Sequence, residues 1–165
     1  MELHLKDYFT LANAASGFLA LVLYSSFGYF ASFGLIVLAV LFDFLDGIVA
    51  RKDGSHNEFG KQLDSLADAV SFGAAPVALV FFQGAPSGVS FFIVLLGCVF
   101  FLSSVVLRLA KFNLQTHKGV YFGLPSPAAA LILLLFGWIS TPFTIGLLFA
   151  LGVLMTVPIQ FKKVF

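Results

Sequence analysis

Residues 30–51 read FASFGLIVLAVLFDFLDGIVAR, a mainly apolar run that ends at a basic residue. About 20 apolar residues in a helix are enough to cross the hydrocarbon core of a bilayer, so this run predicts a membrane span. The run nevertheless contains two acids, Asp43 and Asp46. Because a carboxylate at membrane depth is costly, such acids usually mark a functional site. The run therefore predicts both a membrane fold and the location of its site.

The composition of the whole chain is that of an integral membrane protein. Of its 165 residues, 60% are hydrophobic and only 10% are charged, which is too little charge for the surface of a water-soluble domain. We expect one membrane domain at residues 1–165. The opening MELHLKDYF lacks the features of a cleaved signal peptide. The single cysteine, Cys98, excludes an internal disulfide and is expected to be a packing residue.

Apolar runs bounded by glycine, proline, serine or charge predict an all-α protein with six transmembrane helices. The predicted spans are residues 9–26, 30–51, 63–82, 89–112, 126–140 and 143–160. The last two spans depend on a break at Ser140, Thr141 and Pro142, and five spans is the alternative without it.

The positive charges predict the topology. All nine basic residues lie in the N-terminus, the second and fourth connections, the C-terminus or the adjacent helix ends: Lys6, Arg51, Lys52, Lys61, Arg108, Lys111, Lys118, Lys162 and Lys163. By the positive-inside rule, both termini and these connections face the cytoplasm, which requires an even number of spans. Asp43 and Asp68 lie about 10–12 Å from the nearest charged helix end, at 1.5 Å per residue. We therefore expect a site that opens to the cytoplasm.

Four aspartates fall on two helical stripes, because residues three or four apart share a helix face. The stripes are Asp43, Asp46, Gly47 and Ala50 on the second span, and Gly60, Asp64 and Asp68 at the start of the third. Facing carboxylates repel one another unless cations lie between them. Oxygen ligands favour Mg²⁺, with Mn²⁺ or Ca²⁺ as alternatives, so the stripes predict one or two divalent cations.

Small residues beside the acids predict room for a phosphate-bearing substrate. Gly47, Ala50 and Gly60 leave space along the two stripes. Carboxylate-held cations with open positions commonly bind a pyrophosphate, and Arg51 at the interface can add a bidentate phosphate contact.

The spacing D-x2-D-G-x2-A-R-x8-G-x3-D-x3-D, from Asp43 to Asp68, resembles the signature of the CDP-alcohol phosphatidyltransferase family. Three further stretches look like the phosphatidylserine synthase branch of that family: LDSLADAVSFGAAPVAL at 63–79, RLAKFN at 108–113 and FGLPSPAAA at 122–130. Lys111 departs from the branch, where arginine is expected. The resemblance covers most of the chain.

The resemblance implies a six-span, usually homodimeric enzyme. It would transfer a phosphatidyl or archaetidyl group from a CDP-linked lipid to the hydroxyl of L-serine and release CMP. The implied metal ligands, for Mg²⁺ or Mn²⁺, are Asp43, Asp46, Asp64 and Asp68, with Asp68 also the general base. The implied CDP-lipid site comprises Asp46, Gly47, Ala50, Arg51 and Gly60.

Five other polar residues are candidates, each with a plainer interpretation. Asn13 and Asn57 can reach the CDP-lipid, or they can be a helix-helix contact and a turn residue. Arg108, Lys111 and Lys118 can bind the acceptor, or they can be interfacial cations of a cytoplasmic loop.

Other functions stay open at this point. The same family includes enzymes for other acceptors, such as glycerol phosphate, inositol phosphate or choline. Intramembrane acids also occur in ion or proton transporters, but here the outer connections carry no charge. The four aspartates can also form a structural ion-pair cluster with Arg108 and Lys111.

Overall fold

The computed structural model describes residues 4–53, 58–114 and 123–157, and this part of the chain is built of helices without strands. The elements are α1 (Leu5–Val22), α2 (Tyr24–Asp53), α3 (Glu58–Asp68), the π-helical η1 (Ala69–Ala74), α4 (Ala75–Gly84), α5 (Val89–Leu114), α6 (Ser126–Phe136) and α7 (Thr141–Thr156). Since α3, η1 and α4 run on as one helix from Glu58 to Gly84, the described residues form six helical segments. The predicted all-α class is confirmed.

Among the described residues, three helices are long and apolar enough to cross a membrane: Tyr24–Arg51, Glu58–Gly84 and Val89–Leu114. Many of their large apolar side chains are exposed, Phe30 by 76% and Phe92 by 70%, which suits contact with lipid and not with water. The shorter α6 and α7 are also apolar. At 11 residues, α6 is about 16 Å long, roughly half the thickness of the hydrocarbon core.

The first predicted span, 9–26, was placed too late along the chain, while the second, 30–51, lies within the observed stretch Tyr24–Arg51 and ends with it. α1 begins at Leu5 because the main-chain N–H of His4 donates to Asp7 Oδ2 at 2.9 Å and caps the helix. Lys6 and Asp7 are buried inside the protein, so charge did not mark the helix boundary there. α2 then begins at Tyr24 and bends at Gly28, whose φ of 78° breaks the helical conformation.

The predicted break between the last two spans is confirmed, although α6 ends at Phe136 and not at residue 140. Thr144 donates hydrogen bonds to the carbonyls of Gly137 and Ser140, which ties the start of α7 to the turn before it. Pro142 lies in the first turn of α7, where its missing N–H costs nothing.

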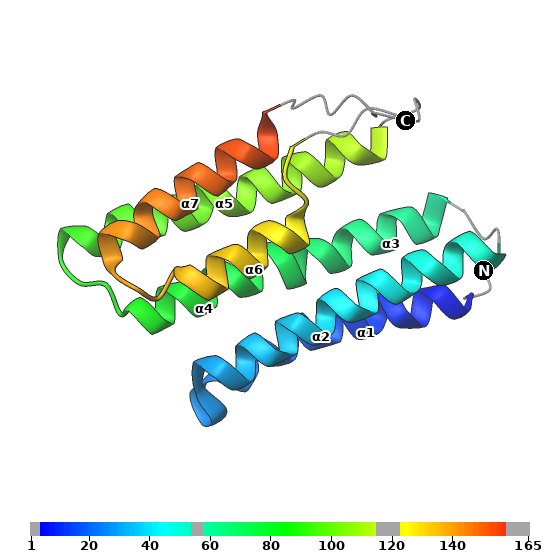
Figure 1. Ribbon diagram of the computed structural model, residues 1–165, viewed down its shortest axis with the longest axis horizontal. Coiled ribbons are helices and arrows are strands. Elements are labelled where there is room, and N and C mark those ends of the chain that lie inside the picture. The colour runs from blue at the N-terminus through cyan, green and yellow to red at the C-terminus, as the bar shows by residue number, and fades with distance from the viewer. Residues whose placement is uncertain (1–3, 54–57, 115–122, 158–165) are drawn as a thin grey trace.

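The helix ends are sorted to the two ends of the bundle (Figure 1). The start of α1, the end of α2 and the start of α3 lie at one end, together with the ends of α5 and α7. The turns from α1 to α2, α4 to α5 and α6 to α7 lie at the other. The basic residues with described side chains are Lys6, Arg51, Lys61, Arg108 and Lys111, all within about two turns of the first end.

Glycines bring the helices together on both sides of the bundle. A Cβ atom at Gly17 would lie 2.6 Å from the Cα of Ser71, so α1 presses directly on η1. A Cβ at Gly152 would lie 2.6 Å from the ring of Phe100, so α7 is equally close to α5. The first of these contacts places α1 beside the helix that carries Asp64 and Asp68.

Candidate metal centre

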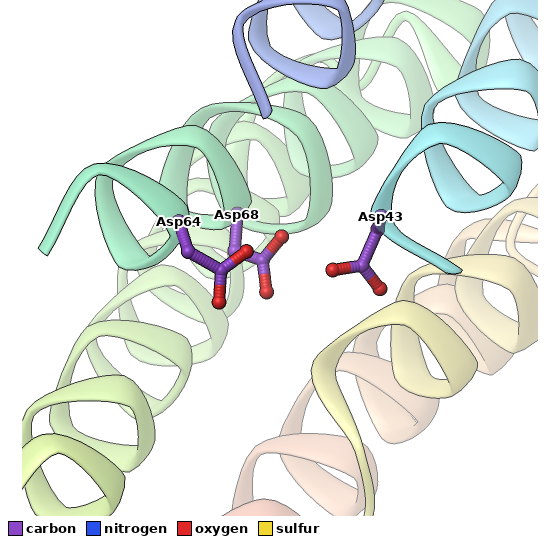
Figure 2. A group of neighbouring side chains, drawn as sticks. All are labelled: Asp43, Asp64 and Asp68. Atoms are coloured by element: carbon purple, nitrogen blue, oxygen red, sulfur yellow. The ribbon is translucent and has the colours of Figure 1, made fainter. Parts of the chain in front are cut away.

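Three aspartates from two helices face one another (Figure 2). Asp43 projects from α2, while Asp64 and Asp68 project from successive turns of α3. One carboxylate oxygen from each lies within 4.8 Å of the others. The two predicted stripes therefore do converge, because each places its acids on the face that meets the other helix.

The donor set fits a divalent cation. The three groups are all carboxylates, which hard cations such as Mg²⁺ and Mn²⁺ prefer. Asp64 Oδ1 is buried and has no hydrogen-bond partner among the described residues. A buried carboxylate oxygen without a partner costs free energy, which a cation at this position offsets.

Asp46, the fourth predicted ligand, lies outside this group of three. Its side chain is buried, and its Oδ2 accepts a hydrogen bond of 2.8 Å from the hydroxyl of Thr10 on α1. It lies one turn along α2 from Asp43, beside the cavity described next. A four-carboxylate ligand set stays a prediction.

A cavity of about 480 Å³ lies beside these acids at the end of the bundle where α2 ends and α3 begins. Its lining residues come from α1, α2, α3 and α5: Lys6, Thr10, Asp46, Gly47, Ala50, Arg51, Glu58, Gly60, Lys61, Asp64 and Phe112. The five CDP-lipid residues implied by the signature are all among them. Asp64 lines this cavity and also belongs to the group of three acids, so the two features adjoin.

Several of these lining residues were not predicted from the sequence. Lys6 and Thr10 lie four residues apart on one face of α1, and Asn13 follows after three more. That spacing of polar residues in an apolar protein was a usable signal. Lys61 lines the cavity from α3, and its Nζ donates a hydrogen bond to the main-chain carbonyl of Asn113 on α5.

Asn13 is fully buried and donates a hydrogen bond of 3.0 Å from Nδ2 to Asp68 Oδ1. It does not line the cavity. Two roles were predicted for Asn13, and the structure shows the contact with a neighbouring helix.

The predicted acceptor residues separate from one another. Arg108 Nη1 donates to Ser126 Oγ at 2.9 Å, and Arg108 Nε is buried with no partner among the described residues. Lys111 is exposed on α5 and does not line the cavity. Asn57 and Lys118 lie outside the described residues. Ser126, at the start of α6, was not predicted as a site residue.

Comparison with known proteins identifies the family. Residues 3–158 match the CDP-alcohol phosphatidyltransferase family. The CDP-diacylglycerol–serine O-phosphatidyltransferase of Methanocaldococcus jannaschii is 38% identical over 161 residues, 96% of this chain and 74% of the relative. The archaetidylserine synthase of Methanothermobacter thermautotrophicus is 39% identical over 166 residues, 97% of this chain and 70% of the relative. The chain therefore belongs to the CDP-alcohol phosphatidyltransferase family.

Proposed function

We propose that this membrane enzyme transfers a phosphatidyl or archaetidyl group from a CDP-linked lipid to the hydroxyl of L-serine and releases CMP. The observation that carries the proposal is the convergence of Asp43, Asp64 and Asp68 beside a cavity lined by the family signature. Two relatives that match most of this chain are named for serine transfer. One is a CDP-diacylglycerol–serine O-phosphatidyltransferase and the other is an archaetidylserine synthase.

The cavity suits the pyrophosphate of the donor. Lys6, Arg51 and Lys61 bring positive charge to its wall, and Gly47 and Gly60 leave the wall without side chains there. Asp43, Asp64 and Asp68 would hold one or two divalent cations, which would neutralise the pyrophosphate and make CMP a better leaving group.

Asp68 is our candidate for the general base. The serine hydroxyl is a weak nucleophile at neutral pH, so its proton must move to a nearby carboxylate as its oxygen attacks the lipid-linked phosphorus. A new bond forms between the serine oxygen and that phosphorus, while the bond from the phosphorus to the CMP oxygen breaks. The proton ends on Asp68, and no covalent enzyme intermediate is required.

Arg108 is our candidate for the residue that binds the carboxylate of the substrate serine. The bond from Nη1 to Ser126 fixes one edge of the guanidinium, and Nε remains buried without a partner among the described residues. A guanidinium edge with unused donors binds a carboxylate in a planar, two-bond geometry. A phosphorylated acceptor asks for a denser basic pocket than this one arginine.

The proposal also includes a membrane topology and an oligomeric state. We propose that six segments cross the membrane, with both termini and the cavity facing the cytoplasm, and that the enzyme is a homodimer. In a Cys98→Ala background, Lys111→Cys should react with a membrane-impermeant thiol reagent from the cytoplasmic side only, and Ser87→Cys from the opposite side only. Mass measurement of the protein in lipid nanodiscs tests the dimer.

A product assay tests the activity itself. Purified enzyme is given CDP-diacylglycerol or its archaeal ether analogue together with serine, glycerol phosphate, inositol phosphate or choline, in Mg²⁺, Mn²⁺ or chelator. Mass spectrometry should detect the serine lipid and CMP, and only with a divalent cation. A product with another acceptor in place of serine, or equal turnover in chelator, would contradict the proposal.

A further inference from the structure

α1 differs from the long apolar helices because it buries a polar face. Its buried residues include Lys6, Asp7, Thr10, Asn13 and Ser16, spaced three or four apart for most of the helix. Polar side chains inside a membrane protein are costly unless they have partners or a function. Thr10 and Asn13 each donate a hydrogen bond to an acid of the site on another helix.

Each of these two donors takes one oxygen of one acid. Thr10 Oγ1 lies 2.8 Å from Asp46 Oδ2 on α2, and Asn13 Nδ2 lies 3.0 Å from Asp68 Oδ1 on α3. The Thr10 hydroxyl also lies 3.2 Å from the Lys6 carbonyl, but its single proton favours the shorter bond to the carboxylate. One helix thus contacts one acid on each of the two stripes.

The position of Asn13 is itself fixed by packed backbone. Its main-chain carbonyl accepts a hydrogen bond of 2.9 Å from Ser71 Oγ, and Ser71 belongs to η1 just after Asp68. The lack of a side chain at Gly17 allows this approach, because a Cβ there would overlap Ser71. Asn13 has no exposed surface, so its amide has little freedom to leave Asp68.

We propose that Thr10 and Asn13 are positioning residues, which hold Asp46 and Asp68 by one oxygen each so that the other oxygen faces the cation and the acceptor. This rests on the proposed function, because it assigns these acids to the transfer site. Ligating carboxylates are commonly oriented by such outer hydrogen bonds, and losing one typically costs about 10- to 100-fold in metal affinity or activity. The proposal differs from a nucleotide-binding role for Asn13, which would act on donor binding.

The main test is Asn13→Ala, measured in four ways on purified protein. We expect kcat for serine transfer to fall about 10-fold or more. We expect the affinity for Mn²⁺, measured by electron paramagnetic resonance, to fall by about the same factor. The KM for the CDP-lipid should stay within about twofold, because Asn13 does not line the cavity. The metal-free Tm should fall no more than in the control Ser16→Ala.

Ser16→Ala is the matched control, because Ser16 is a buried polar residue of the same helix whose hydroxyl donates at 2.8 Å to the Ala12 carbonyl of α1 itself. Thr10→Val is the second variant, since valine keeps the shape of threonine and opens no cavity. It should weaken Mn²⁺ binding while Ser16→Ala does not, and it decides the matter if Asn13→Ala fails to fold. Unchanged Mn²⁺ affinity in the folded variants, or a raised KM for the CDP-lipid as the only defect of Asn13→Ala, would overturn the proposal.

The two proposals can fail separately. If the unmodified enzyme does not transfer to serine, the proposed function fails, while the Mn²⁺ comparison among the three variants still judges the positioning role. If the unmodified enzyme is active and Asn13→Ala matches it in kcat and Mn²⁺ affinity, only the positioning role fails.

Discussion

The two sides of the bundle are joined by different kinds of contact. Around the acids, α1 meets α2 and α3 through directed hydrogen bonds, from Thr10 to Asp46 and from Asn13 to Asp68. On the other side, α5 meets α7 through close apolar packing at Gly97 and Gly152. There the rings of Phe100 and Phe149 lie 5.2 Å apart.

The two kinds of contact have different effects, because hydrogen bonds orient side chains while apolar packing holds the helices together. A hydrogen bond fixes the direction of a side chain, which a metal ligand or a base needs. Apolar packing in a bundle holds the backbones together without setting the direction of any polar atom. Substitutions on the acid side should therefore change chemistry at nearly constant stability, and substitutions between α5 and α7 should do the reverse.

The largest effect is expected for Asp64→Asn on the acid side. The buried Asp64 Oδ1 loses its charge at the point where three carboxylates meet, so a cation is held poorly. Transfer to serine should fall by about a thousandfold or more, measured as CMP release. Tm without metal should change little or rise, since one of three repelling charges is gone, and retained turnover would contradict the metal site.

Gly152→Val tests the other side of the comparison. The new side chain meets the Phe100 ring, whose nearest atom would lie 2.6 Å from the Cβ, so the rings and helices must shift. The free energy of unfolding should fall by about 1–3 kcal/mol, measured by denaturation in detergent. The KM for serine should stay unchanged at temperatures where the variant is folded, and a changed KM would mean that this packing does reach the site.

Ser126→Ala sharpens the comparison at the border of the two regions. Arg108 reaches from α5 to Ser126 at the start of α6, and without the hydroxyl one edge of the guanidinium is no longer fixed. The KM for serine should rise about 10-fold, near the value of one hydrogen bond to a charged group, with the KM for the CDP-lipid unchanged. Initial rates over a serine titration measure this, and an equal rise in both KM values would contradict the assignment.

The smallest effect is expected for Cys98→Ala on the apolar side. The thiol is buried and makes a weak contact, 3.7 Å long, with the Val77 carbonyl. The free energy of unfolding should fall by about 1 kcal/mol or less, with kcat and both KM values unchanged. A loss of activity on this substitution would show that the thiol takes part in the reaction.

The acids of the site could be predicted from the sequence, but the contacts that other helices make with them could not. Asp43, Asp64 and Asp68 could be placed together because helix periodicity puts the acids of each stripe on one face of its helix, and the two helices are consecutive in the chain. The bonds from α1 could not be predicted, since they depend on how α1 is rotated about its own axis against α2 and α3. The start of α1 was placed too late because Lys6 was assigned to the N-terminus before the first span, whereas the fold buries it beside the cavity.

The contact between Arg108 and Ser126 was missed for a similar reason. The residues are 18 positions apart and lie on different helices, so no periodic pattern links them. The length of α6 was overestimated because the apolar character continues past Phe136 to Trp138 and Ile139, where the backbone already turns.

The π-helical turn after Asp68 limits which changes of chain length this helix can accept. A π turn contains about one residue more than an α turn, and one residue corresponds to about 100° of rotation around a helix axis. Ala69–Ala74 therefore sets the phase between the face with Asp64 and Asp68 and the face that α4 buries in the core. Point substitutions on either face leave this phase intact, but deletion of a single residue here would turn the acids away from α2 or the core face of α4 toward lipid.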